Sequence, residues 1–145
     1  MGSNPIFPKS LMQKCPYSYV SSHYNLLVLK KRRVKKIIYS KSIINIVKLL
    51  YRSGAISYFS ILNSTTSKQM YIKFTVFFYK NISFFQKLIQ VSTSSKSFYI
   101  TNKSLKLTQK IFKSTIIFIS TSKGYLTHKE ALSLGLGGKI IYLLI

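Results

Sequence analysis

The chain has 145 residues, of which 47% are hydrophobic, so it can bury a core and is not a disordered cationic tail. It carries 23 Lys and Arg residues against one acidic residue, Glu130, and its net charge of +22 indicates a polyanionic partner, with nucleic acid the first candidate and an anionic membrane surface the second. The absence of Asp leaves no carboxylate pair and no Asp-supported triad, so the sequence predicts no enzymatic activity.

The first part of the chain is expected to be an irregular extension, because residues 1–16 contain all three prolines and no clear period. A helix is expected over Tyr17–Leu29. Six basic residues then fall within Lys30–Lys36, interrupted only by Val34. We interpret this run as a phosphate-binding patch, with a solvated basic loop or strand edge as the alternative. Its predicted RNA contacts are Lys31, Arg32, Arg33, Lys35 and Lys36.

A second helix is predicted over Ile43–Leu50, where the apolar residues follow the i, i+3, i+4, i+7 spacing of a core-facing helix. Ser40 or Ser42 is expected to cap its start, because a serine hydroxyl accepts hydrogen bonds from the first free N–H groups of a helix. Gly54 lies where the left-handed residue that ends a helix is expected.

Two strands follow, over Ala55–Leu62 and Met70–Tyr79, and the polar segment Asn63–Gln69 joins them as a turn. The second strand is rich in aromatic residues. We interpret these as core or sheet packing rather than as platforms for nucleic-acid bases, because they recur at strand spacing and not in a loop.

The C-terminal part is predicted to begin near Phe84 and to be rich in strands. Short strands are expected over Leu88–Ser92 and Lys96–Thr101, and a brief helix over Leu105–Phe112. A β-branched strand over Ser114–Ile119 then leads into a small polar loop.

That loop is Ser120–Gly124, and a capped helix follows it. The pattern Thr127 to Glu130 predicts a capping box, in which each of the two side chains bonds the backbone N–H of the other residue. Gly135 is expected to end the helix, and a final strand, apolar on both faces, is predicted over Lys139–Ile145.

These elements predict an α+β fold of two small packed subdomains. After the extension of residues 1–16, residues 17–83 are expected to form an N-terminal α/β subdomain, and residues 84–145 a C-terminal β-rich subdomain with short helices.

Neither a metal site nor a membrane span is expected. His23, His128, Cys15 and Glu130 show none of the close spacings of metal ligands, and we expect His128 to be exposed in a first helical turn. The interval Ser53–Ser67, which is as long as any that is free of Lys and Arg, is interrupted by polar residues, whereas a spanning helix needs roughly 18 uninterrupted apolar residues. The sequence thus predicts no cofactor and no membrane insertion.

The order of the last motifs resembles a known family. Ser120 to Gly124 reads Ser-Thr-Ser-Lys-Gly, Thr127 follows, and positions 135–138 read Gly-Leu-Gly-Gly. This pattern and its spacing resemble the small-subunit ribosomal protein eight family of bacterial type. Upstream, the Val91-Ser92 pair and Tyr99 fall where the family has a Val-Ser pair and a Tyr around a Pro-Gly turn.

The chain departs from the family pattern at two places. The Pro-Gly turn of the family is Ser94-Ser95 here, with Ser97 in place of the usual basic residue, which puts RNA contact at that turn in doubt. The Glu that follows the Gly-Gly pair in the family is Lys139 here, which exchanges an acceptor for a cation.

The chemistry of the polar loop agrees with an RNA-binding role, with an ordinary polar turn as the alternative. Ser and Thr hydroxyls bond ribose 2′-OH groups and phosphates, glycine permits close backbone approach, and one Lys supplies a phosphate contact. Besides the basic run, the predicted RNA-binding residues are Ser120, Thr121, Ser122, Lys123, Gly124 and Lys139.

The resemblance implies a structural protein of the small ribosomal subunit that binds the central domain of the small-subunit rRNA and supports assembly, with the fifth small-subunit protein as a neighbour. The alternative is a cationic nucleoid or membrane-surface protein that binds by charge alone. Ile, Lys, Phe, Tyr, Asn and Met make up 69 residues and Gly, Ala, Arg and Pro only 14, which is typical of an A/T-rich genome. We therefore expect a mitochondrial ribosome, or alternatively that of a plastid-type organelle.

Overall fold

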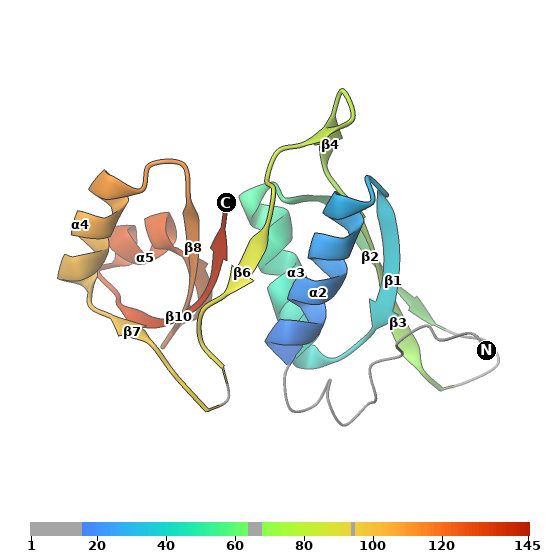
Figure 1. Cartoon of the computed structure of the whole chain (residues 1–145). Coiled ribbons are helices and arrows are strands. Elements are labelled where there is room, and N and C mark those ends of the chain that lie inside the picture. The colour runs from blue at the N-terminus through green and yellow to red at the C-terminus, as the bar shows by residue number, and fades with distance from the viewer. Residues whose placement is uncertain (1–15, 64–67, 94) are drawn as a thin grey trace.

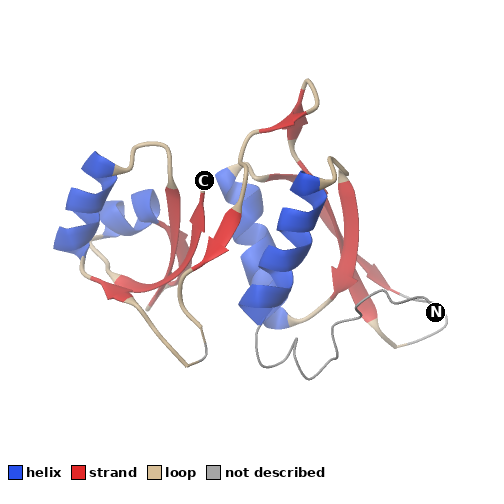
Figure 2. Ribbon diagram, in the orientation of Figure 1, coloured by secondary structure: helices blue, strands red, loops and turns tan. Residues whose placement is uncertain are grey.

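The computed structural model describes residues 16–63, 68–93 and 95–145 and confirms an α+β fold (Figures 1 and 2). Residues 1–15 of the predicted extension, most of the turn before Met70, and Ser94 lie outside this description. The first half comprises α2 (Pro16–Leu29), β1 (Val34–Ile38), α3 (Lys41–Ser53), β2 (Ile56–Asn63), β3 (Met70–Val76), β4 (Phe78–Tyr79) and β5 (Ile82–Ser83). The second half comprises β6 (Leu88–Gln90), β7 (Tyr99–Ile100), α4 (Asn102–Ile111), β8 (Ile116–Thr121), β9 (Gly124–Thr127), α5 (His128–Leu134) and β10 (Gly138–Leu144).

The elements stack in layers (Figure 1). At one end lies a three-stranded antiparallel sheet of order β1-β3-β2, which we call sheet A. Helices α2 and α3 cover one of its faces. Next comes sheet C, of order β6-β10-β8-β9 with β7 also paired to β10, and α4 and α5 cover its far side. One core runs through α2, α3 and the facing sides of both sheets, and a small second core fills the space under α4 and α5.

Helix α3 forms as its sequence predicts. The side chain of Ser40 accepts a hydrogen bond from the Ile43 N–H at 3.2 Å, which identifies Ser40 rather than Ser42 as the cap. Gly54, at φ 90°, ends the helix. The apolar face is buried, and Ile43, Val47 and Leu50 have no exposed surface.

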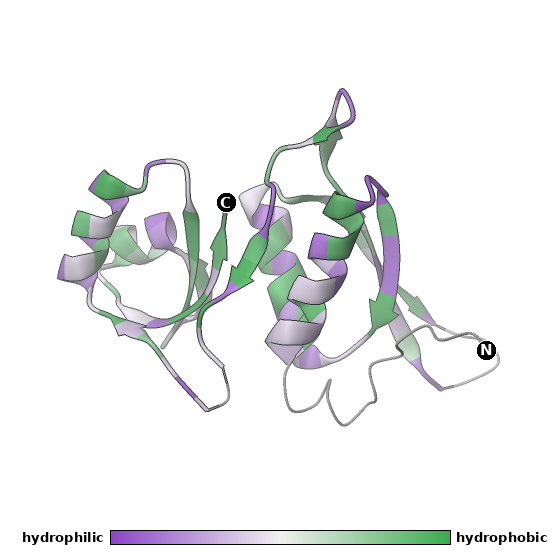
Figure 3. Cartoon of the chain, in the orientation of Figure 1, coloured by the Kyte–Doolittle hydropathy of each residue, from purple (hydrophilic) through white to green (hydrophobic). Residues whose placement is uncertain are grey.

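Sheet A has a buried face and an open face because side chains alternate along its strands. In β3, Ile72, Phe74 and Val76 are buried against the helices, while Lys73 points the other way. Within the described residues, none of the helices covers this second face (Figure 1). Figure 3 shows hydrophilic residues along β1 and at the turn that precedes it.

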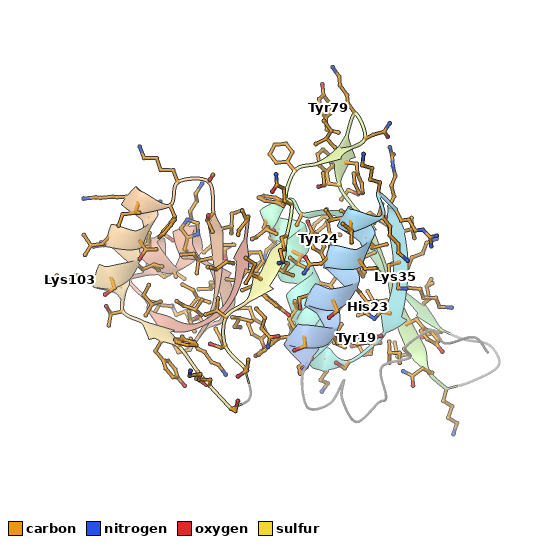
Figure 4. All side chains as sticks on the ribbon, viewed as in Figure 1. Tyr19, His23, Tyr24, Lys35, Tyr79 and Lys103 are labelled. Carbon is orange, nitrogen blue, oxygen red and sulfur yellow. The ribbon has the colours of Figure 1, made fainter. Side chains whose placement is uncertain are left out.

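The predicted strand Met70–Tyr79 is interrupted in the structure. It leaves sheet A after Val76, and Phe78–Tyr79 pairs instead with Ile82–Ser83 in a separate hairpin. The turn residues Lys80 and Asn81 both have positive φ, 51° and 64°, as a two-residue hairpin turn of the I′ type requires. This hairpin projects from the body of the molecule, with Tyr79 near its tip (Figure 4).

Sheet C is built around β10. It pairs with β8 along one edge, and with β7 and then β6 along the other. The strand predicted over Lys96–Thr101 is shorter, and helix α4 starts earlier than predicted because Thr101 caps it by accepting from the Ser104 N–H at 3.2 Å. Strand β9 was not predicted.

The expectation of an exposed His128 is wrong. Its side chain is buried, and Nδ1 accepts a hydrogen bond from the Ile117 N–H at 3.1 Å. Burial and the nearby Lys129 charge lower the pKa of His128, which keeps the ring neutral and able to accept. Thr127 caps α5 as predicted, whereas the Glu130 carboxylate accepts from Arg52 at 3.1 Å.

None of the helices in the described ranges is long and apolar enough to cross a membrane. Across the same residues, no group of three or more His, Cys, Asp or Glu side chains is placed to hold a metal ion.

Candidate nucleic-acid interface

The polar segment Ser120–Gly124 is a tight hairpin turn between β8 and β9. Thr121 pairs with Gly124 across the hairpin, so Ser122 and Lys123 form its exposed tip. The Thr121 hydroxyl donates to the Gly124 carbonyl at 2.9 Å and accepts from the Lys123 N–H at 3.2 Å. It is therefore occupied within the turn, whereas the tip is accessible to a ligand.

Gly124 closes this hairpin with φ +99°, a conformation that side chains other than glycine rarely adopt. No atom lies within 4 Å of the position that a Cβ atom would take there. The glycine is thus required by the backbone of the turn, and the space beside it is open for the approach of a ligand.

A second glycine requirement lies in β10, which passes unusually close to its neighbours. A Cβ atom at Gly138 would overlap the carbonyl oxygen of Ser120, and one at Gly137 would lie 2.5 Å from the carbonyl oxygen of Ile100. The Gly-Gly pair therefore lets β10 fit tightly between β7 and the end of β8, and it positions Lys139 beside the hairpin.

Lys139 lies in a row of side chains that crosses sheet C. It pairs with Tyr99 of β7 on one side and with Ser120 of β8 on the other, and Ser120 pairs in turn with Tyr125 of β9. Directly paired residues of antiparallel strands point to the same face. The structure therefore brings Lys139 together with the Ser120–Gly124 hairpin, although Lys139 comes 15 positions after Gly124 in the sequence.

The same face of sheet C is attached to the start of α2. The hydroxyls of Tyr17 and Tyr125 are 2.9 Å apart, and the Tyr142 hydroxyl donates to the Tyr17 carbonyl. Burial, followed by the hydrogen bond to Tyr17, raises the pKa of Tyr125, so this phenol remains protonated and hydrogen-bonded. The base of the hairpin is thereby fixed to the first half of the chain.

The connection between β6 and β7 is held by Ser92, which is fully buried. Its hydroxyl donates to the Ile140 carbonyl and accepts from the Phe98 N–H at 3.0 Å. Ser92 thus ties this connection to β10, next to Lys139. The sequence pattern singled out the Val91-Ser92 pair, but only the structure shows its positioning role.

The basic run divides between the turn after α2 and strand β1. Lys31, at φ 53°, and Arg32 lie in the turn, and Arg33 donates to the side-chain oxygen of Asn81 at 3.5 Å. Lys36 is exposed on the open face of sheet A. Lys35 points to the opposite, helix-covered face and is half-buried.

Lys35 lies near His23 of α2 (Figure 4). Burial, and then the charge of Lys35, lower the pKa of His23 to about 4. Lys35 is thus placed differently from the exposed members of the run, and the alternation of side chains in a strand explains the difference.

The structure does not join the basic run and the hairpin into one patch. The run belongs to sheet A and the hairpin to sheet C, with α2 and α3 between them (Figure 1). The sole side-chain carboxylate of the sequence, that of Glu130, pairs with Arg52. No further acidic side chain is present to neutralise either surface.

Sequence reasoning missed two cations near the hairpin. Lys48 and Arg52 of α3, together with Gly124 and Tyr125, line a hollow between that helix and β9. One guanidinium nitrogen of Arg52 donates to the Tyr125 carbonyl at 2.8 Å, which fixes this side chain there. The apolar period that predicted α3 identified the buried face of the helix. It contained no information on which element the other face of the helix contacts, and in the structure that element is β9.

Comparison with known proteins identifies a family for the chain. The family model described as "Ribosomal protein S8" matches residues 22–144. The chain is also similar to the small ribosomal subunit protein uS8 of Dictyoglomus turgidum (strain DSM 6724 / Z-1310), with 29% identity over 103 residues that cover 71% of this chain and 76% of that relative. The match includes both sheets, the hairpin and the Gly-Gly pair, so the chain belongs to the ribosomal protein S8 family and is a structural protein of the small ribosomal subunit.

Proposed function

We propose that the chain binds the central domain of the small-subunit rRNA during assembly and that the Ser120–Gly124 hairpin makes the specific contact. The observation that carries this proposal is the exposed tip of a rigid turn, with Ser122 and Lys123 outermost. Structured RNA is recognised mostly by shape and by contacts to 2′-hydroxyls and phosphates. A short turn fixed by its own hydrogen bonds suits such a surface, because little conformational freedom is lost on binding.

Lys139 extends this contact. Its row position beside Ser120 supports a role as a phosphate ligand next to the hydroxyl groups of the hairpin. The basic run is proposed to act differently. Its exposed members supply affinity by releasing counterions from the RNA; these are Lys31, Arg32, Arg33 and Lys36. Half-buried Lys35 contributes mainly to the positive electrostatic field of the protein.

In this proposal residues 17–83 form the N-terminal subdomain and residues 84–145 the C-terminal, RNA-recognising one. The positions of sheet A within the first range and sheet C within the second support the division, although a shared core packs the two parts together. The fifth small-subunit protein is proposed as a neighbour, and the amino-acid usage supports an organellar ribosome, mitochondrial before plastid.

A competition assay tests the role of the hairpin. We expect Ser122→Ala to weaken binding to a central-domain rRNA fragment by roughly 1–3 kcal/mol, at about physiological salt and with non-cognate duplex RNA as competitor. Ser114→Ala is the matched control, because Ser114 is also exposed but lies just before the start of β8, at the opposite end of that strand from the hairpin. Gly124→Val should weaken binding more than any single Lys change, since a β-branched residue does not adopt φ +99°.

If Ser122→Ala keeps the cognate preference while Lys changes abolish it, charge alone governs binding and the hairpin assignment is wrong. A second measurement addresses the assembly role. The purified native protein should co-sediment with small ribosomal subunits at a salt concentration that removes purely electrostatic binders.

A further inference from the structure

The open face of sheet A carries a cluster of cations and aromatic rings that the hairpin site does not use. Lys36 of β1 is paired directly with Lys73 of β3. Two residues further along, Val34, Thr75 and Tyr58 form the next outward row across β1, β3 and β2. Helices α2 and α3 lie on the other side of the sheet (Figure 1).

The Lys36–Lys73 pair is unfavourable in the isolated protein. Like charges directly opposite each other on antiparallel strands repel, and no acidic residue occurs in β1, β2 or β3 to separate them. The Lys36 ammonium is held 4.4 Å from the centroid of the Tyr71 ring, on the diagonally adjacent position. Lys36, held in this way, and the exposed Lys73 beside it form a suitable site for a phosphate.

The aromatic ring of Tyr58 completes the arrangement. It is 63% exposed on β2, which is an edge strand of the sheet, so its ring is open to a ligand. Its row lies two residues from the lysine pair, which is about 7 Å along the strands. Of the two lysines, Lys73 is the nearer to Tyr58, because β3 neighbours β2 whereas Lys36 lies one strand further away and is held over Tyr71. A short stretch of RNA can therefore place a base on the ring and a phosphate at the lysine pair.

We propose that the open face of sheet A binds an unpaired stretch of RNA, with a phosphate between Lys36 and Lys73 and a base stacked on Tyr58. An unpaired strand is favoured over a duplex because only a splayed base presents its flat face to an aromatic ring. The inference rests on the proposed rRNA-binding function, but it uses residues of sheet A alone. It therefore assigns the chain a second RNA contact that is independent of the Ser120–Gly124 hairpin.

A tryptophan reporter tests the stacking step in the full chain. The sequence contains no Trp, so Tyr58→Trp introduces a unique fluorophore at the proposed base platform. A single-stranded oligouridylate of ~10 nucleotides should quench its fluorescence on binding. The control is Phe112→Trp. Phe112 is 54% exposed at the end of α4 and has lysines close by in the sequence, but α4 lies at the end of the molecule opposite to sheet A (Figure 1). Its fluorescence should change little.

Charge-matched variants test the phosphate step. Lys36→Gln with Lys73→Gln should weaken oligouridylate binding about tenfold, and Tyr58→Ala should have a similar effect, whereas Tyr58→Phe should retain binding. Lys103→Gln with Lys106→Gln removes the same charge from α4, where Lys103 projects from the far end of the molecule (Figure 4), and should weaken binding by about twofold at most. Without RNA, the first double variant should melt at a higher temperature than the wild type at low salt.

Three results would overturn the inference. Equal losses in the two lysine double variants would show that only net charge matters. Equal quenching of the Tyr58→Trp and Phe112→Trp variants would remove the stacking site. A blue shift of the Tyr58→Trp emission with phosphatidylserine–phosphatidylcholine vesicles, but no response to the oligonucleotide, would assign the face to membranes. If central-domain rRNA binding still depends on Ser122 in any of these cases, the hairpin proposal stays intact. If instead Ser122→Ala has no effect on that binding while the sheet A variants behave as expected, the hairpin proposal fails and this inference stands.

Discussion

Replacing Gly138 by Ala should destabilise the protein by displacing two strands next to the proposed RNA contact. The added methyl group would overlap the Ser120 carbonyl oxygen and come within 3.0 Å of the Ile119 side chain. Gly138 has an ordinary φ, so the cost arises from contact and not from backbone conformation. Because the opposing atom belongs to the backbone of β8, it moves only if the β8–β10 pairing opens.

Overpacking of this kind costs typically 1–3 kcal/mol, and a backbone obstacle at a central strand favours the upper end. For a chain of this size, ~3 kcal/mol corresponds to a fall in Tm of about 6–12 °C. The same displacement separates Lys139 from Ser120, so affinity for the central-domain rRNA fragment should also fall.

Urea unfolding and rRNA binding of the same preparations measure both effects. Gly135→Ala is the control, because Gly135 has φ +71° but no atom within 4 Å of the position that the alanine methyl group would take. This variant therefore bears only the strain of the left-handed conformation, ~1–2 kcal/mol, and should leave RNA affinity nearly unchanged. If Gly138→Ala unfolds within ~0.5 kcal/mol of the wild type and binds RNA normally, the close approach of β10 to β8 does not constrain the site as argued.

Three further outcomes are expected. Changing Lys31, Arg32 and Arg33 together to Ala should weaken the binding of cognate and non-cognate RNA alike. It should also reduce the slope of log affinity against log salt concentration by up to about three. A loss of affinity confined to cognate RNA would contradict the non-specific role proposed for the basic run. Because the pKa of His128 is lowered in the folded protein, the unfolded chain binds its proton first, and the free energy of unfolding should decrease as the pH falls below about 6.5. His128→Asn keeps an acceptor for the Ile117 N–H and should flatten that pH dependence in urea titrations, while His23, whose pKa is about 4, retains its own share. An unchanged profile would mean that the lowered pKa of His128 is not the source of the pH dependence. Arg52→Ala should cost less than ~1 kcal/mol of stability for its loss of the exposed Glu130 ion pair, and a much larger loss in thermal melts would show that its bond to the Tyr125 carbonyl dominates.

Local features of the fold were predictable from the sequence. The apolar period and caps of α3 are confirmed, as is the Thr127 cap of α5, because these depend on residues three or four positions apart. Strand β9 was missed because it consists of four residues, including Gly124, and forms only through its pairing with β8. The burial of His128 was missed for a related reason: its hydrogen-bond donor, Ile117, lies in a different element.

For the candidate site too, the sequence predicted local features but not the contacts between distant residues. Ser120–Gly124 is contiguous, so its motif indicated a turn, although the sequence did not reveal that the Thr121 hydroxyl is occupied within it. The pairing of Lys139 with Ser120 follows from sheet register, which one sequence does not specify. The different faces of Lys35 and Lys36 follow from the phase of β1, and this phase is set by packing against α2 and α3.

The central place of β10 in sheet C has a consequence for folding during synthesis. Sheet A is complete once Val76 has been made, whereas β6 and β7 pair only with β10, which ends at Leu144, and the β8–β9 hairpin joins them only through that strand. Domains generally fold as they emerge, N-terminal parts first. We therefore expect the growing chain to acquire the open face of sheet A well before the Ser120–Gly124 hairpin is held in place. Hydrogen exchange on chains truncated before Gly138 should show protected amides in β3 and unprotected ones in β6, whose strand partner is β10; protection in β6 would contradict this order.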